Sequence, residues 1–403
     1  MKRVFFSVVL LLVTGLSFAQ ENNVKEAKNI ANGTNPDFAK AEKLINQALT
    51  NAETKDDANT WNIAGFVQKR KNDKQMESAY LRQPYDTVVL YNSALKMCQF
   101  YFKCDELAQI PNEKGKIKNK FRKTNAAAML SARNNLINGG VYYFNLDNSK
   151  EAFPYFATYV DMKASPMFAE DANVQNDTII SQIAYYAALA ALKSEDYANV
   201  QKYAQFGIED KEVGKFCMQY IADSYKAQGD TAKWITALQD GLQKYPEHSI
   251  FFGALVDYYT ANNKYDEAMA FADNMLAKDS NNSFYLYVKG YLYLNMKQYD
   301  KAIEFYDKTI AIDPKHADAY SYKGLAYCLQ AQDFSEKATT DETSPKYAED
   351  QKTLKAFYEK AKPCYEQARS LQPEKKDLWL QGLYRVYYML KMDSNLQEIE
   401  SMM

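Results

Sequence analysis

Glycine and proline are scarce in this chain, with 14 and 10 copies among 403 residues. Sheet proteins need many tight turns, and these two residues supply most of them, so a fold built from many strands is excluded. The hydrophobic fraction of 47% is too high for a disordered chain. Ala, Leu, Glu, Lys, Gln and Met, which favour helix, are plentiful. The composition therefore predicts an all-α protein with a buried core.

Side chains that perform catalysis or bind metals are also few. The chain has only two histidines, His248 and His316. The zinc-hydrolase pattern HExxH, the serine-hydrolase pattern GxSxG and the phosphate loop GxxxxGK do not occur. We therefore expect no catalytic residues, no metal and no cofactor, in a protein that is not an enzyme.

The five cysteines show no CxxC pair or other metal-ligand spacing. We interpret them as small apolar side chains packed within helices. The alternative is a single disulfide in an oxidising compartment, and Cys328 with Cys364 is the pair that we would test.

Charge of neither sign dominates, since 49 Lys and Arg balance 51 Asp and Glu to a formal net charge of −2. Binding to nucleic acid needs a basic field, so nucleic acid is excluded as a partner. The densest basic segment, Lys114–Lys123, contains a glycine and is interpreted as a solvated loop. Its alternative role is peripheral contact with anionic phosphate groups of a cell envelope, which salt would weaken.

Only one long apolar run is present, and it lies at the N-terminus. Two basic residues precede the run Val4–Leu16, and the sequence SFA that follows has the small-x-small pattern of a cleavage site. This arrangement predicts a secretory signal peptide over residues 1–19. The first cysteine is Cys98, so no lipid-anchor cysteine follows the cleavage site. We expect an exported protein that neither spans the membrane nor carries a lipid anchor, and that is periplasmic, secreted or associated with the outer membrane.

A 34-residue pattern repeats through the second half of the chain. In Ser283–His316, Gly290 stands at position 8, Ala302 at position 20 and Tyr306 at position 24. The three preceding blocks carry small and aromatic residues in corresponding slots, and they are Ser181–Gly214, Lys215–His248 and Ser249–Asn282. The pattern resembles the tetratricopeptide repeat (TPR), most clearly over KGYLYLNMKQYDKAIEFYDKTIAIDP. The resemblance implies an all-α fold, a right-handed α-solenoid of stacked helix–turn–helix units.

The residue types in these slots suit two helices in close contact. Small residues at positions 8 and 20 let the helices of a unit approach to about 8–10 Å, and aromatic rings at positions 11, 17 and 24 fill the space between units. Trp234 occupies position 20 of its block, where a small residue is expected. We therefore predict a local distortion at Trp234.

The repeat pattern also predicts how the chain is divided. We expect a signal peptide over 1–19, followed by degenerate TPR-like helical repeats with insertions over 20–125. A TPR unit with a polar linker is expected over 126–180, and four regular units over 181–316. The chain then continues with a TPR unit over 317–375, which has an insertion of about 25 residues near 331–354, and with capping helices over 376–403. The insertion contains the polar stretch SEKATTDETSPKYAED, and we expect a loop followed by a helical extension after Pro345.

Tyrosine, with 33 copies, is unusually abundant. In TPR proteins the first helix of each unit lines a concave groove, and the resemblance places part of the tyrosine excess there. The partner-binding residues that it implies are Tyr185, Tyr186, Phe216, Tyr220, Asp223, Asp257, Phe284, Tyr287, Tyr291, Tyr384 and Tyr388. Tyrosine suits such a surface because it combines an apolar ring with a hydroxyl group. The alternative is that these rings only pack against the next repeat.

The resemblance implies a non-enzymatic protein–protein interaction scaffold, here in the bacterial cell envelope, that holds a segment of a partner protein in the groove. A carbohydrate- or nutrient-binding protein of the envelope is the alternative, since aromatic rings stack on sugars. Chaperone-binding TPR proteins clamp a C-terminal carboxylate with Lys at position 5 and Asn at position 9, and neither residue occurs in those slots. The identity of the partner stays open.

Overall fold

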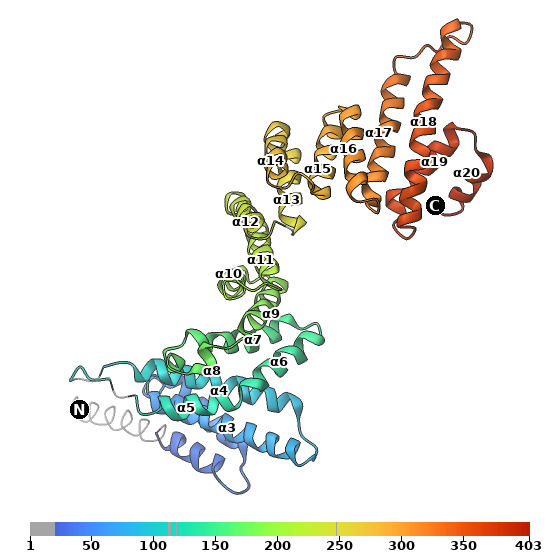
Figure 1. Cartoon of the computed structure of the whole chain (residues 1–403). Helices are drawn as coiled ribbons and strands as arrows, with labels where there is room; N and C mark the ends of the chain where they lie inside the picture. The colour runs from blue at the N-terminus through green and yellow to red at the C-terminus, as the bar shows by residue number, and fades with distance from the viewer. Residues whose placement is uncertain (1–20, 112–113, 118, 247) are drawn as a thin grey trace, which may run out of the picture. The chain divides into compact units, whose positions relative to one another are not determined.

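The computed structural model describes residues 21–111, 114–117, 119–246 and 248–403 (Figure 1). The predicted signal peptide and Lys118 of the basic segment lie outside these residues. The described ranges consist of helices, turns and connecting segments, with no strand among them. None of the helices described there is both long enough and apolar enough to cross a membrane. The all-α prediction is confirmed.

The chain forms two compact units, Met1–Lys244 and Tyr245–Met403, which we call unit 1 and unit 2. In unit 1 a helical segment over 21–31 precedes α2 (Phe38–Thr50), α3 (Ala58–Tyr80), α4 (Thr87–Ala108), α5 (Arg122–Ser131), α6 (Arg133–Asn145), α7 (Ser149–Ala164), η1 (Pro166–Phe168), α8 (Ala172–Gln175), α9 (Ile180–Lys193), α10 (Tyr197–Ala204), α11 (Gly214–Ala227) and α12 (Thr231–Lys244). Unit 2 contains α13 (Ser249–Ala261), α14 (Tyr265–Lys278), α15 (Ser283–Asn295), α16 (Tyr299–Ile312), α17 (Ala317–Ser335), α18 (Pro345–Leu371), η2 (Lys376–Leu378), α19 (Leu380–Met389) and α20 (Asp393–Glu400).

Four consecutive helix pairs keep the 34-residue period. Their second helices, α10, α12, α14 and α16, begin 34 residues apart, at Tyr197, Thr231, Tyr265 and Tyr299. The first two pairs belong to unit 1 and the last two to unit 2. This succession of helix pairs is the architecture of the predicted α-solenoid, whereas the individual domain boundaries stay predictions.

One residue in the left-handed conformation lies between the two helices of each pair. Glu195, Gly229, Asn263 and Lys297 occupy the same slot of the repeat, with φ angles of 58°, 73°, 57° and 58°. This conformation costs a residue with a Cβ roughly 1 kcal/mol or more, and glycine avoids that cost. Because only one of the four residues is glycine, the packing of the two helices imposes the turn.

Glycine at position 8 of a repeat makes room for the ring at position 24. A Cβ added to Gly290 would lie 2.7 Å from Cε1 of Tyr306, and one added to Gly140 would lie 2.4 Å from Cε1 of Phe156. Non-bonded carbon atoms make their best contact at about 3.5–4.0 Å, so neither position has room for a side chain. Ala302, at position 20, is fully buried. The predicted role of the small residues is confirmed.

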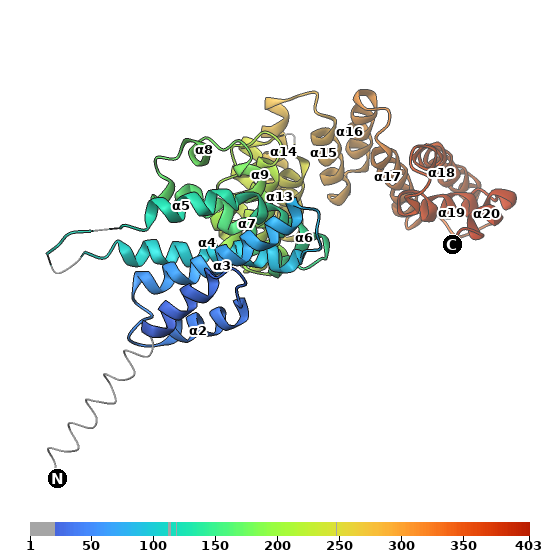
Figure 2. The same ribbon diagram turned by 90° about the horizontal axis from the view of Figure 1, so that it is seen from below.

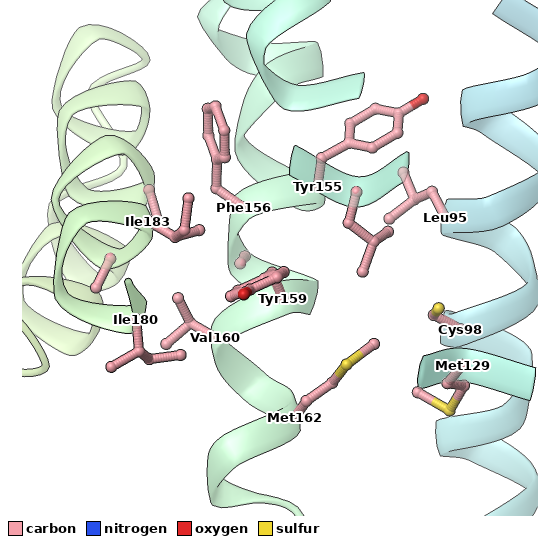
Figure 3. Close-up of a cluster of buried hydrophobic side chains, with 14 of the residues drawn as sticks. Leu95, Cys98, Met129, Tyr155, Phe156, Tyr159, Val160, Met162, Ile180 and Ile183 are labelled. Atoms are coloured by element: carbon pink, nitrogen blue, oxygen red, sulfur yellow. The ribbon is translucent and has the colours of Figure 1, made fainter. Parts of the chain in front are cut away.

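Helix α7 carries the centre of the unit 1 core (Figure 3). Figure 3 shows Tyr155 and Met162 on the side of α7 that faces α4 and α5, and Val160 on the side that faces α9. Ile180 and Ile183 of α9 meet it there. Three successive parts of the chain therefore share one hydrophobic core.

Within the range 126–180, where a polar linker is predicted, residues 167–177 pack against the unit 1 core. Phe168 and Val174 are fully buried, and both belong to the unit 1 core. The carboxylate of Asp177 accepts hydrogen bonds from Arg133 at 2.6 Å and from the Tyr159 hydroxyl at 2.7 Å. The two apolar side chains anchor a segment whose composition is otherwise polar.

The insertion within 317–375 is largely helical. Helices α17 and α18 have 19 and 27 residues, whereas α15 and α16 have 13 and 14. Pro345 is the first residue of α18, and Ser344 Oγ accepts a hydrogen bond from Lys346 N–H. The predicted extension after Pro345 is therefore confirmed, and the polar loop is limited to residues 336–344. A second long pair, α3 and α4, runs side by side in unit 1 (Figure 2).

Trp234 remains half-buried on α12, while Ala237 and Leu238 of the same helix are buried. The Lys226 ammonium lies 5.1 Å from the centroid of its ring. Because Lys226 belongs to α11, the half-buried Trp234 ring takes part in the contact between α11 and α12, and α12 stays helical from Thr231 to Lys244.

All five cysteines are buried free thiols, including Cys328 and Cys364. Burial raises the pKa of Cys104 and Cys217 to about 12 and that of Cys328 and Cys364 to about 11. The thiolate is the form that attacks electrophiles and binds metals, so these cysteines are unreactive at neutral pH.

Candidate functional site

The predicted groove residues lie on first helices of the helix pairs in both units. Those of unit 1 are Tyr185 and Tyr186 on α9, with Phe216, Tyr220 and Asp223 on α11. Those of unit 2 are Asp257 on α13, Phe284, Tyr287 and Tyr291 on α15, and Tyr384 and Tyr388 on α19. Each unit therefore holds its own group of candidate residues.

In unit 1 the rings form a row from α7 to α11. Tyr185 stacks on Tyr220 with 5.5 Å between ring centroids, and the Tyr220 hydroxyl donates to that of Tyr185 at 3.1 Å. Phe216 and Tyr186 lie on either side of Tyr185, at 6.0 and 5.1 Å. Tyr186 also contacts Phe156, yet 40% of it is exposed. Tyr185 and Tyr220 are engaged in packing, whereas Tyr186 presents free surface.

Asp223 is the acidic member of this group. Burial raises its pKa, and the Gln219 side chain partly offsets that effect by donating a hydrogen bond at 3.5 Å. A carboxylate that is poorly solvated at the edge of an aromatic row can accept a further hydrogen bond from a partner.

In unit 2 four tyrosines form what we call the tyrosine cluster: Tyr287, Tyr291, Tyr306 and Tyr322. Tyr322 of α17 lies 5.8 Å from Tyr287, 5.9 Å from Tyr291 and 6.3 Å from Tyr306, between ring centroids. Tyr287 also contacts Tyr306 and His316, and burial raises its pKa strongly. Tyr287, Tyr291 and Tyr322 are all half-buried, and the rings of Tyr287 and Tyr322 each pack against side chains of neighbouring helices.

Tyr306 is fully buried in this cluster, and its hydroxyl has no hydrogen-bond partner among the described residues. The orphaned hydroxyl costs about 1–3 kcal/mol of desolvation. The ring itself is held because Gly290 leaves space for it.

Two further predicted residues of unit 2 differ in exposure. Phe284 packs against Phe252, with 5.7 Å between ring centroids. Asp257 is exposed on α13, and its charge contributes to the raised pKa of Tyr322. Of these two, only Asp257 presents its side chain fully to solvent.

A cavity of about 290 Å³ lies between α17 and α19. We call it the C-terminal pocket, and it is lined by Ser321, Tyr322, Leu325, Tyr365, Asp377, Leu378, Gln381, Gly382 and Arg385. Tyr322 belongs to both the pocket and the tyrosine cluster, so the two features are continuous. A concavity of this size is close to the lower end of ligand-binding cavities.

The pocket is fixed by side-chain contacts at its floor. The Ser321 hydroxyl donates to the carbonyl oxygen of Leu378, which joins α17 to η2. The ring of Tyr365 reaches the pocket from α18 and lies against Gly324 and Gly382. Because these groups are held by packing, the pocket exists before any ligand arrives.

The exposed face of α19 extends the pocket. Leu383 and Val386 are buried, while Gln381, Arg385 and Tyr388 are exposed. Tyr384 stacks on Tyr388 at 6.4 Å with 19° between the ring planes, and Tyr388 is 62% exposed. The predicted residues Tyr384 and Tyr388 thus border the pocket's wall on the same helix.

Sequence reasoning missed Tyr322, Gln381 and Arg385. Tyr322 stands at position 6 of the repeat that begins at Ala317, a slot that lines the groove in TPR proteins, so the same rule applied to that repeat would have found it. Gln381 and Arg385 stand four residues apart on one face of α19, as helix periodicity requires.

Comparisons with known proteins agree with this architecture. Sequence models of the tetratricopeptide repeat match residues 221–283 and 283–316. No curated protein matches the chain.

The solved structures to which the chain is similar include TPR proteins of low sequence identity. The C-terminal part of a TPR repeat-containing protein from Cytophaga hutchinsonii is 15% identical, with 64% of this chain and 91% of that chain covered and a TM-score of 0.39. A TPR repeats protein from Bacteroides fragilis is 17% identical, with 67% and 99% covered and a TM-score of 0.30. The TPR domain of P58(IPK) is 12% identical, with 93% and 99% covered and a TM-score of 0.32.

The matched region 221–316 contains α12 to α16. The second helices of its helix pairs, α12, α14 and α16, begin 34 residues apart. Sequence matches and helix pairs therefore coincide over this region, and the chain contains tetratricopeptide repeats.

Proposed function

We propose that this protein is a non-enzymatic scaffold of the cell envelope that holds a segment of a partner protein against the first-helix surface of unit 2. The tetratricopeptide repeats support a role in protein–protein interaction. The observation that carries the proposal is the C-terminal pocket, which continues into the exposed face of α19. A preformed cavity, aromatic rings and exposed polar side chains together suit the binding of a peptide segment.

The groups that most often act in catalysis serve structural roles here, which supports a non-enzymatic protein. His316 Nδ1 accepts a hydrogen bond from Ala319 N–H at the start of α17, and its ring lies 4.8 Å from that of Tyr287. His248 precedes α13 and contacts Phe251. Burial holds the pKa of the thiols at values that suppress the thiolate.

The envelope setting rests on the predicted signal peptide over residues 1–19. N-terminal sequencing of the protein from fractionated cells tests it. A mature chain that starts near Gln20 and occurs in the periplasmic or extracellular fraction is expected. An uncleaved chain in the cytoplasmic fraction rejects this part of the proposal.

The basic segment Lys114–Lys123 supplies a contact with anionic envelope groups in this proposal. Its base is fixed, because Arg122 makes two hydrogen bonds of 2.8 Å to Asp105, and Asn119 donates to the same carboxylate at 2.6 Å. Co-sedimentation with phosphatidylglycerol vesicles should occur at low salt and be lost at about 0.5 M salt. Binding that salt does not weaken contradicts an electrostatic contact.

Site-specific crosslinking tests the proposed groove. A photoreactive p-benzoylphenylalanine placed at Tyr388 in expressing cells should give a discrete adduct with a protein, because this residue is exposed beside the pocket. The adduct should weaken severalfold when Tyr384 is changed to Ala. The matched control is the same probe at Tyr80, which is 79% exposed in unit 1.

Two results reject the groove. One is the absence of a protein adduct at Tyr388, and the other is an equal adduct pattern at Tyr80. Binding to an oligosaccharide on a glycan array without any protein adduct would favour the carbohydrate-binding alternative.

A further inference from the structure

We propose that the C-terminal pocket recognises a short extended peptide stretch with a basic group at one end and an acidic group at the other. The inference rests on the proposed function, because it assigns a chemistry to the segment held at this surface. Asp377 faces the basic group of the ligand, and Arg385 faces the acidic group.

One wall of the pocket has an ordered charge pattern. Asp377, Gln381 and Arg385 follow one another at intervals of four residues. Asp377 lies in η2, whereas Gln381 and Arg385 lie four residues apart on one face of α19. An extended peptide of about four residues spans roughly 13 Å, at about 3.3 Å per residue. The wall is therefore acidic at one end, neutral and polar in the middle, and basic at the other end.

Both charges are available to a ligand. Asp377 and Arg385 are exposed, and neither forms an ion pair with another residue in the part of the chain that the structure describes. The neighbouring lining residues Tyr322, Leu325 and Gly382 carry no charge. A bound segment with complementary charges therefore meets no competing internal partner.

A pattern of ion pairs between neighbouring repeats is interrupted at the pocket. In two preceding repeats a lysine at position 7 pairs with an aspartate of the second helix before it: Lys289 with Asp273, and Lys323 with Asp307. The corresponding slot of the segment that begins at Lys376 holds Gly382. Gly382 has no side chain that could form the equivalent ion pair, and the ring of Tyr365 and the pocket occupy the space beside it.

The middle of the pocket suits a peptide main chain. The Gln381 side chain offers an acceptor and two donors, which match the carbonyl and N–H groups of an extended strand. Tyr322 and Leu325 provide apolar surface for a side chain between the two charged ends. Recognition of charge at both ends fixes the direction of the segment.

Fluorescence anisotropy with three labelled, end-blocked peptides tests the proposal on the full-length protein. Their cores are Lys-Leu-Ala-Glu, the reversed Glu-Ala-Leu-Lys, and the neutral Gln-Leu-Ala-Gln. One charged order should bind about fivefold more tightly than the other two peptides, as expected for two solvated charge contacts. The double variant Asp377→Lys/Arg385→Glu should reverse the preference between the two charged orders.

The matched control exchanges an exposed pair on a second helix, Glu304→Lys/Lys308→Glu on α16, whose side chains are already paired at 2.6 Å. It should leave the peptide preference unchanged. Equal binding of all three peptides, or a preference that the Asp377/Arg385 exchange does not reverse, overturns the proposal. If the Tyr388 adduct persists in that case, only this inference fails; if the adduct is also absent, the proposed function fails with it.

Discussion

The ring of Tyr365 occupies the space beside Gly382, where an added Cβ would lie 2.2 Å from its Cε1 atom. The opposite edge of the same ring lies against Gly324, where an added Cβ would lie 2.8 Å from Cε2. One ring of α18 is therefore held between glycines of α17 and α19. This contact joins the long helix pair to the C-terminal helices and forms the floor of the C-terminal pocket.

Replacing Gly382 with Ala should destabilise the protein by about 1–3 kcal/mol, because the added Cβ would overlap the Tyr365 ring, whose opposite edge lies against Gly324. Urea denaturation followed by circular dichroism measures the change. The control is Gly253→Ala on α13, where an added Cβ meets no atom within 4 Å. That variant should gain about 0.5–1 kcal/mol from the higher helix propensity of alanine. A Gly382→Ala variant as stable as Gly253→Ala would contradict the packing described.

Replacing Tyr306 with Phe should leave stability unchanged or raise it by about 1 kcal/mol, because the substitution removes an orphaned buried hydroxyl and keeps the ring. Tyr285→Phe is the matched variant, since the Tyr285 hydroxyl donates to the Pro246 carbonyl oxygen at 3.0 Å. It should lose about 1 kcal/mol. Thermal unfolding of both variants decides the matter, and a larger loss for Tyr306→Phe would show that its hydroxyl is in fact hydrogen-bonded.

Replacing Lys297 with Gly should stabilise the turn between α15 and α16 by about 0.5–1 kcal/mol, because glycine adopts the observed φ of 58° without a Cβ penalty. The reciprocal change, Gly229→Ala, should destabilise the equivalent turn, where φ is 73°. Chemical denaturation measures both. Loss of stability in Lys297→Gly would mean that the lysine side chain contributes more than its backbone conformation costs.

Replacing Asp177 with Asn should cost about 2–3 kcal/mol, because it leaves the largely buried Arg133 guanidinium without its anionic partner. The side chains of this pair are 12% and 8% exposed. Asp147→Asn is the control, since the side chain of Asp147 in its pair with Lys193 is 89% exposed and such pairs contribute little. Equal thermal stabilities for the two variants would show that the linker does not depend on this ion pair.

Several features of the fold follow from local sequence pattern. The sequence predicts the 34-residue period, the small residues at positions 8 and 20 and the rings at position 24. It does so because each helix pair repeats the same contacts with its neighbour. The helical extension after Pro345 was readable because proline is favoured in the first turn of a helix.

The candidate site was only partly predictable. The groove slots of TPR proteins placed Tyr384 and Tyr388 on the first helix of the last segment, and on α19 Tyr384 is half-buried and Tyr388 exposed. Tyr287 occupies an equivalent kind of slot, yet it is surrounded by Tyr306, His316 and Tyr322. Whether a ring is buried depends on the side chains of the following helix, which the position of a residue within its own repeat does not specify.

The sequence by itself determined an all-helical repeat, its period and the residues at which helices approach each other, because these depend on spacing along the chain. Only the tertiary structure decided that Phe168 and Val174 dock the linker, and that the pocket opens at Gly382 with Asp377 and Arg385 unpaired. Burial and ion pairing depend on contacts between segments that are distant in sequence, and these contacts form only when the helices pack.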